Sequence, residues 1–256
     1  SPGRVTWSVW KALFLREIIA RLTASRGAWL WMLLEPVAHV AILMLIFAFI
    51  RQREPFGVPG PMFIMTGVLT FFMMRNAFRR CTDAVTANAA FFTYRQVKPV
   101  DTVLVCAAVE GFLYTIVASL LIAGAGFMGF QAFPNDPLSA LLAFALMWLI
   151  GSGMGLIFSA LSSLAPEIGK VVKMVNRPLY LASCVVFPSK LIPQPYQDWV
   201  MLNPFVHGVE SLRAAFFPTY QVAPQLSLAY LAFCGQLTVF LGLILHLHFA
   251  SRFKER

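Results

Sequence analysis

The sequence predicts an all-α integral membrane protein with six transmembrane helices, and three observations lead to this prediction. Hydrophobic residues make up 59% of the 256 residues and charged residues only 12%, which is about half the charged fraction of a soluble globular chain. The mean hydropathy is +0.74. The apolar residues also gather in segments long enough to cross a hydrocarbon core of about 30 Å.

The first predicted span covers residues 29–50. Trp29 and Trp31 stand at its start, where tryptophan is typical of a membrane–water interface. Glu35 and His39 interrupt the apolar run near its entry end. Polar residues inside a span usually face protein or water, so this helix is expected to pack against partners or to line a cavity. For Glu35 a local capping or pairing role remains an alternative.

Residues 5–24 precede this span and predict a helix that lies on the membrane surface. Trp7, Trp10 and Phe14 recur at steps of three and four, and lysine and arginine accompany them. This mixture is typical of interfacial helices. A solvated leader segment is the alternative.

Five further apolar segments complete the six spans. They cover residues 62–78, 103–130, 138–164, 171–187 and 225–250. Gly151 and Gly155 form a GxxxG step in the fourth span, and small residues at this spacing favour close helix packing. In the third span we expect Glu110 to pair with Arg75, Arg79 or Arg80.

Two connections carry structure of their own. Residues 84–94 predict a short helix that begins after Thr82 and Asp83, an acceptable N-cap pair. Residues 188–224 hold six prolines, which exclude one continuous helix. Within them we expect a helix that starts with Asn203 as N-cap and Pro204 at its first position. Glu210 and Arg213 then share a face and are expected to pair.

The distribution of cations predicts the orientation. With the N-terminus in the cytoplasm, 16 of the 20 lysines and arginines fall on the cytoplasmic side. Basic residues are enriched on that side of membrane proteins, so both termini are expected there. This placement also accounts for most of the net charge of +9 without nucleic acid.

The sequence contains none of the motifs that mark a catalytic or metal centre. There is no HExxH, no GxSxG and no phosphate-binding GKS or GKT loop. We therefore expect a protein that is not an enzyme, with no catalytic residues, no metal site and no cofactor of its own. Lys173, Arg177 and Tyr180 in the fifth span are open to two interpretations: positive-inside anchoring, or a basic entrance for an anionic substrate.

Four segments resemble a known family. They are LREII from Leu15, GAWLWMLLEPVAH from Gly27, GVLTFFMMRNAF from Gly67 and NPFVHGVESLRAAFFPTY from Asn203. In these patterns, and over nearly its whole length, the chain resembles the membrane subunit of ABC-2 type exporters. It is most similar to the permease of the group 2 capsular-polysaccharide export system of Gram-negative bacteria.

The resemblance implies a half-transporter in the bacterial inner membrane. Two copies would form the conduit for a lipid-linked polysaccharide, and each would dock a separate ATPase subunit that uses ATP and Mg. A periplasmic adaptor of the polysaccharide co-polymerase type and an outer-membrane exporter would be further partners. Residues 84–94 would be the coupling helix, and residues 188–224 would form re-entrant gate helices on the periplasmic side.

Three groups of residues follow as candidates. The substrate path would use Arg26, Trp29, Trp31, Glu35, His39, Lys173, Arg177, Tyr180 and Phe187. ATPase docking would use Asn88, Phe91, Phe92, Tyr94, Arg95 and Glu167. The periplasmic gate would use Asn203, Pro204, His207, Glu210 and Arg213.

Alternative functions remain at this stage. Another ABC-2 exporter could move O-antigen, teichoic acid, or a small lipid or drug. A membrane enzyme acting on a polyprenyl-linked sugar would need a constellation of acidic residues or histidines facing one side, which the sequence does not offer.

Overall fold

A computed structural model describes residues 2–23, 34, 37–46, 57–93 and 96–249. Every regular element in these ranges is helical. The longer helices are α1 (Pro2–Thr23), the Val37–Ile46 helix, α3 (Gly60–Ala87), α4 (Pro99–Phe127), α5 (Pro137–Leu164), α6 (Pro166–Ala182), α8 (Pro204–Phe216) and α9 (Leu228–His248). Short elements are η2 (Ala89–Thr93), η3 (Ser189–Leu191) and α7 (Gln194–Val200).

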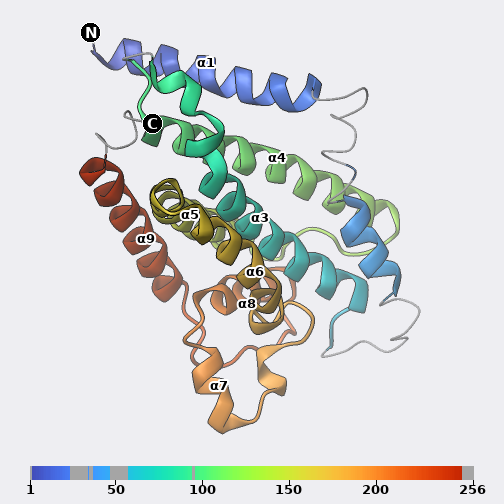
Figure 1. The fold of residues 1–256 in the computed structure, drawn as a ribbon. Coiled ribbons are helices and arrows are strands. Elements are labelled where there is room, and N and C mark those ends of the chain that lie inside the picture. The colour runs from blue at the N-terminus through green and yellow to red at the C-terminus, as the bar shows by residue number, and fades with distance from the viewer. Residues whose placement is uncertain (1, 24–33, 35–36, 47–56, 94–95, 250–256) are drawn as a thin grey trace.

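Helix α3 forms the centre of the bundle. It contacts α4, α5, α6 and α8, and these helices surround it in Figure 1. Its apolar side chains, from Met62 to Met74, belong to the main hydrophobic core. The rest of the molecule is therefore arranged around this helix.

Helix α5 packs between α3 and α9, and glycines allow the close approach. A Cβ added at Gly151 would lie 2.5 Å from the carbonyl oxygen of Met74 in α3. A Cβ added at Gly153 would lie 2.7 Å from the backbone nitrogen of Val239 in α9. The tight packing predicted from the glycine spacing is confirmed, and it holds α5 to a neighbour on each side.

Among the described residues, four helices are long and apolar enough to cross a membrane: α3, α4, α5 and α9. They correspond to the predicted spans 62–78, 103–130, 138–164 and 225–250. The predicted first span, 29–50, lies partly outside the described residues, and its described part is the 10-residue helix Val37–Ile46. The predicted fifth span, 171–187, differs from α6, which has 17 residues and ends at Ala182.

The connection after α3 also differs from the prediction. A helix was expected to begin after Thr82 and Asp83, but α3 runs without a break to Ala87. The Thr82 hydroxyl donates to the carbonyl of Phe78 at 2.8 Å, as a residue inside a helix does. No glycine or proline stands between Val68 and Ala87 to stop the helix. Only η2 remains of the separate helix predicted for residues 84–94.

Helix α1 packs on α4. Leu13 is buried in a cluster with Val105 and Val109 of α4. The indole N–H of Trp10 donates to Asp101 Oδ1 at 2.9 Å. Asp101 is in the first turn of α4, where a carboxylate is favourable. One side of the predicted interfacial helix is thus fixed to the bundle.

The segment between α6 and α9 folds at the end of the bundle farthest from the N-terminus (Figure 1). It consists of η3, α7 and α8, separated by turns. Helix α8 enters the bundle and contacts α3, α5 and α9, whereas α7 projects from it. The prediction that prolines break this segment into short helices is confirmed.

Candidate functional site

Helix α8 begins as the sequence predicts. Pro204 occupies its first turn, and the side chain of Asn203 accepts a hydrogen bond from the Phe205 N–H at 3.0 Å. The Asn203 amide also donates to the carbonyl of Ala182, the last residue of α6, at 3.1 Å. One residue therefore caps α8 and ties its start to the end of α6.

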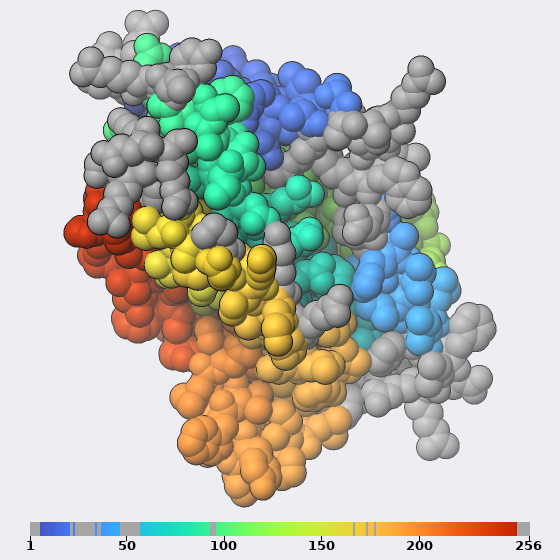
Figure 2. Space-filling view, viewed as in Figure 1, coloured from blue at the N-terminus to red at the C-terminus, as the bar shows by residue number. Residues whose placement is uncertain are grey.

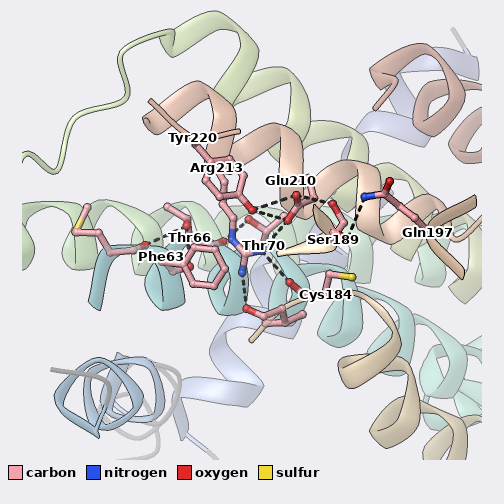
Figure 3. A network of polar contacts seen from close by, with 11 residues as sticks. Phe63, Thr66, Thr70, Cys184, Ser189, Gln197, Glu210, Arg213 and Tyr220 are labelled. Atoms are coloured by element: carbon pink, nitrogen blue, oxygen red, sulfur yellow. Dashed lines mark hydrogen bonds and ion pairs between the residues drawn. The ribbon is translucent and has the colours of Figure 1, made fainter. Parts of the chain in front are cut away.

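The predicted pairing of Glu210 with Arg213 is confirmed. Glu210 Oε1 lies 2.9 Å from Arg213 Nη1, and both side chains are completely buried. The Ser189 hydroxyl donates to Glu210 Oε2 at 2.9 Å, and the Tyr220 hydroxyl lies 2.9 and 3.1 Å from the two carboxylate oxygens (Figure 3). This carboxylate therefore joins η3, α8 and the turn after α8.

Arg213 extends the network to two further elements. Its guanidinium donates to the carbonyls of Cys184, at 2.8 Å, and of Val185, in the turn after α6. It also lies over the ring of Phe63 in α3, with the guanidinium carbon 3.6 Å from the ring centroid. Gly67 leaves the room for it, since a Cβ there would lie 3.2 Å from that carbon.

The network consists of Glu210, Arg213, Ser189 and Tyr220, and we call it the outer network. A buried ion pair stabilises a fold only when hydrogen bonds replace the water that both charges have lost. Here the carboxylate accepts hydrogen bonds from Ser189 and Tyr220, and the guanidinium donates to backbone carbonyls from Nη1 and Nη2. The outer network thus fixes the relative positions of α3, α8 and the end of α6.

His207 connects α8 to the start of α9. Its Nδ1 accepts from the Ser227 N–H at 3.0 Å, so its Nε2 carries the proton and donates to the Met201 carbonyl at 2.8 Å. The ring of Tyr230 packs edge-on at 5.0 Å. Burial lowers the pKa of His207, and the neutral ring satisfies both of its partners.

Two predicted path residues, from different helices, meet on α3. The ring of His39 lies 4.9 Å from that of Phe72, and the ring of Tyr180 lies 6.1 Å from Phe72 and 5.4 Å from Phe71. The Arg75 guanidinium stacks 3.9 Å from the Phe72 centroid. In Figure 2 the teal surface of α3 is visible between the yellow of α6 and the blue of Val37–Ile46. The structure thus forms an aromatic and cationic patch where three helices meet.

Of the other predicted path residues, the structure describes only the side chain of Phe187. Phe187 packs instead beside Cys184 and Met201. Lys173 and Arg177 lie in α6, where backbone spacing places them on the same face as Tyr180, and their side chains are outside the described residues. Also outside the described residues are Arg26, Trp29, Trp31 and Glu35.

The predicted docking residues near η2 differ from one another in what they contact. Asn88 ends α3; its amide donates to the Ala84 carbonyl at 2.8 Å, and its oxygen accepts from Arg16 of α1. The Arg16 guanidinium also lies 4.0 Å from the centroid of Phe91. Phe92 is buried in a core cluster, so its ring serves packing.

The remaining docking candidates are Glu167, Tyr94 and Arg95. Glu167 is exposed in the first turn of α6. Tyr94 and Arg95 lie outside the described residues. Arg80 of α3 lies 3.9 Å from Glu110 of α4. This confirms the prediction that Glu110 pairs with one of Arg75, Arg79 and Arg80.

Several residues of these sites escaped the sequence analysis. They are Arg16, Phe63, Phe72, Ser189 and Tyr220, and Arg75 was expected only as a possible partner of Glu110. All except Phe63 and Ser189 lie in the four segments that carry the family resemblance. Their position in these segments could have marked them as candidate site residues. Their partners were not readable, because Arg16 and Asn88, for example, are 72 positions apart.

Comparison with known proteins shows to which family this chain belongs. The profile of the ABC-2 type transporter family matches residues 8–217. The polysialic acid transport protein KpsM of Escherichia coli is 37% identical over 92% of this chain and 91% of its own length. The capsule polysaccharide export inner-membrane protein CtrC of Neisseria meningitidis serogroup A is 28% identical over 94% of this chain and 90% of its own.

A third relative, the capsule polysaccharide export inner-membrane protein BexB of Haemophilus influenzae, is 26% identical over 94% of this chain and 90% of its own. These relatives and the family are named as transporter components, and none is named as an enzyme. An apolar helical bundle matched over most of its length by such proteins is a membrane subunit of a transporter. The chain belongs to the ABC-2 type transporter family.

Proposed function

We propose that this chain is the membrane-spanning subunit of an ATP-driven exporter of lipid-linked capsular polysaccharide. The observation that carries the proposal is the match to the polysialic acid transport protein KpsM over 92% of the chain. The capsule-export names of the other relatives support the same substrate class. The polymer would move from the cytoplasm to the periplasm across the inner membrane.

The working unit is a homodimer with two ATPase subunits. The sequence holds no phosphate-binding GKS or GKT loop, so nucleotide chemistry is assigned to a partner that uses ATP and Mg. Helix α6 supports the pairing of two copies, because its large apolar side chains remain exposed: Met174 is 78% and Leu181 60% accessible. A second copy of the same helix is a suitable partner for such a face.

The polysaccharide path follows the surface between the Val37–Ile46 helix and α6. His39, Phe72, Arg75 and Tyr180 support this route, because aromatic planes stack on the apolar faces of sugars and a cation attracts acidic groups. Such contacts are individually weak. A long polymer can slide over weak, repeated contacts, whereas a tight site would hold it in place.

ATPase docking uses η2 and the start of α6. Arg16 links this region to α1 through Asn88 and Phe91, so a displacement of η2 would be transmitted to α1 and to α4 beneath it. Closure of the two ATPase subunits on ATP would supply that displacement. The bundles would then separate along the path as rigid bodies.

The outer network supports a gate at the periplasmic end. Glu210 and Arg213 connect the end of α6 to α3 and α8, so α6 and the short helices after it would move together. The excess of cations on the other side of the membrane supports cytoplasmic termini. A periplasmic adaptor and an outer-membrane exporter would continue the route to the cell surface.

The proposal is tested by complementation and co-purification. The chain is expressed in a capsulated bacterium that lacks its own export permease, and surface polysaccharide and proteins bound to the tagged chain are measured. We expect restored capsule and an ATPase subunit at one copy per chain. Recovery of O-antigen or teichoic acid in place of capsule would favour another ABC-2 exporter, and activity on a lipid-linked sugar without any ATPase would overturn the transporter function.

A matched pair of variants locates the docking site. Arg16→Ala removes the contacts of α1 with Asn88 and Phe91, so we expect less bound ATPase and less capsule. Lys11→Ala changes an exposed cation on the same helix and serves as the control. Equal ATPase recovery with both variants would show that the contacts of Arg16 with Asn88 and Phe91 do not support ATPase docking.

A further inference from the structure

A cavity opens beside the outer network. Its volume is about 430 Å³, within the range of small-molecule binding sites. It is lined by Gly57, Pro188, Lys190, Leu191, Thr219 and Gln221. These residues come from the loop before α3, from η3 and from the turn after α8. The mechanism proposed above makes no use of this cavity.

The lining is suited to an anion on a small polar molecule. Lys190 supplies an ammonium group, and Gln221, whose oxygen accepts a hydrogen bond from Lys190, leaves its amide N–H groups available as donors. Pro188 and Leu191 supply apolar wall. Among the described residues that line it, the cavity has one cation and no carboxylate. Among these described residues, a negatively charged group would meet hydrogen-bond donors and no carboxylate.

The cavity is joined to the outer network through neighbouring residues. Ser189 and Tyr220, which bind the Glu210 carboxylate, directly precede Lys190 and Gln221 in the chain. The same two segments are thus tied twice, by Glu210 inside the protein and by the Lys190–Gln221 hydrogen bond at the surface. A ligand that draws Lys190 away from Gln221 would release the surface tie and leave the buried one in place.

We propose that this cavity is a subsite for an anionic sugar residue, held through its negative charge by Lys190 and Gln221. The inference rests on the proposed function, which supplies the polysaccharide. Both a sugar carboxylate and a sugar phosphate carry the required charge. Lys190 is exposed, and in the orientation proposed above its end of the molecule is where exported polymer would leave the gate.

The test measures binding to the purified full-length chain in nanodiscs of neutral phosphatidylcholine. The probes are a sialic acid tetramer, glucose 1-phosphate, and maltotetraose as the uncharged control. We expect an anionic probe to bind, maltotetraose to bind at least tenfold more weakly, and added salt to weaken the binding. Lys190→Gln should weaken it about tenfold, the typical weight of one charge-assisted hydrogen bond. Lys190→Arg should restore most of the affinity.

The binding results distinguish a carboxylate subsite, a phosphate subsite and no subsite. Lys190-dependent binding of the tetramer assigns the subsite to carboxylates, and Lys190-dependent binding of glucose 1-phosphate assigns it to phosphates. Equal binding by the wild type and Lys190→Gln, or equal binding of maltotetraose, overturns the subsite. Lys11→Gln, at an exposed cation on α1, controls for general loss of charge. Because the assay needs no ATPase and no export, its failure is distinguishable from failure of complementation, which overturns the proposed function instead.

Discussion

Helices α3 and α9 are both able to cross a membrane, yet they have opposite surroundings. In α3, 83% of the apolar stretch is buried inside the protein, against 17% in α9. Helix α3 is also the less hydrophobic of the two. It carries Thr66 and Thr70, whose hydroxyls bond to carbonyls of their own helix, and Asn76, which donates to Tyr114 of α4.

Helix α9 instead presents large apolar side chains outward. Phe233 is 62% exposed, Phe240 61% and Leu247 79%. Hydropathy therefore measures how strongly a helix leaves water, and does not say whether protein or lipid replaces the water. Polar residues can be placed on α3 because partners within the protein satisfy them. This difference predicts that substitutions around α3 lower the free energy of unfolding strongly and that substitutions on the outer face of α9 change it little.

The largest effect is expected for Arg213→Met. It leaves the Glu210 carboxylate buried without its cation, which typically costs about 3–5 kcal/mol of unfolding free energy. Thermal unfolding in detergent measures the loss. The double variant with Glu210→Gln should recover part of it, because the unpaired charge is then absent. An Arg213→Met protein as stable as the wild type would contradict the role of the outer network.

The second effect concerns the α3–α5 contact. Gly151→Ala places a Cβ against the Met74 carbonyl, and overpacking of this kind typically costs about 1–3 kcal/mol. Gly124→Ala in α4 is the matched control, because a Cβ there meets nothing within 4 Å. The two thermal unfolding midpoints are compared. Equal midpoints would show that α5 does not approach α3 this closely.

A smaller effect is expected where α1 meets α4. Trp10→Phe keeps the ring but removes the hydrogen bond to Asp101, which should lower the stability of this contact by about 1 kcal/mol. Limited proteolysis within α1 reports its release. Trp7→Phe, at a side chain that is 69% exposed, is the control. Equal cleavage of the two variants would argue against the contact.

The link from α8 to α9 should depend on pH. The pKa of His207 is lowered by burial from its ordinary value of 6.5, so below pH 6.5 the unfolded chain takes up a proton more readily than the folded one. The contribution of His207 to stability is thus complete above pH 6.5 and is lost as the pH falls. Unfolding midpoints at pH 7.5 and 5.5 should differ less in His207→Gln than in the wild type.

His248, which is exposed in the last turn of α9, provides the control for this prediction. His248→Gln should retain the pH dependence of the wild type. If His207→Gln also retains it, protonation of another group is responsible. The hydrogen bonds of His207 with Ser227 and Met201 would then be insensitive to acid.

The smallest effect is expected for Phe240→Leu on the outer face of α9. We expect lipid to cover this face, so either side chain would keep apolar surroundings and the unfolding free energy should change by less than about 0.5 kcal/mol. Thermal unfolding in lipid nanodiscs is the measurement. A loss comparable with that of Gly151→Ala would indicate that a protein surface, such as a second copy, covers this face.

Much of the architecture was predictable from local patterns. Long apolar segments predicted the helices that became α3, α4, α5 and α9, and prolines predicted the break-up of residues 188–224. Asn203, Glu210 and Arg213 were also predictable, because capping and i,i+3 pairing act within one helical turn. The residue at which α3 ends was not predictable, since Thr82 and Asp83 can occupy a helix interior as well as an N-cap.

The candidate sites were also predictable only in part. Their residue types were visible in the sequence: His39 and Tyr180 stood out as polar or aromatic residues in apolar segments. That both rest on Phe72, and that Arg213 reaches Phe63 and the turn after α6, depends on how three helices are rotated about their axes. Helix rotation is set by packing between residues far apart in the chain, which one sequence does not specify.

The sequence by itself determined that this chain is a helical membrane protein, because hydropathy, proline and capping act over a few residues. The tertiary structure alone decided that α3 is the centre and α9 the periphery, although α9 is the more hydrophobic. It also decided that Glu210 and Arg213 bind five separate segments of the chain together. The physical reason is that the hydropathy of each segment decides whether it is removed from water. Whether protein or lipid then surrounds the segment depends on how all the helices pack together.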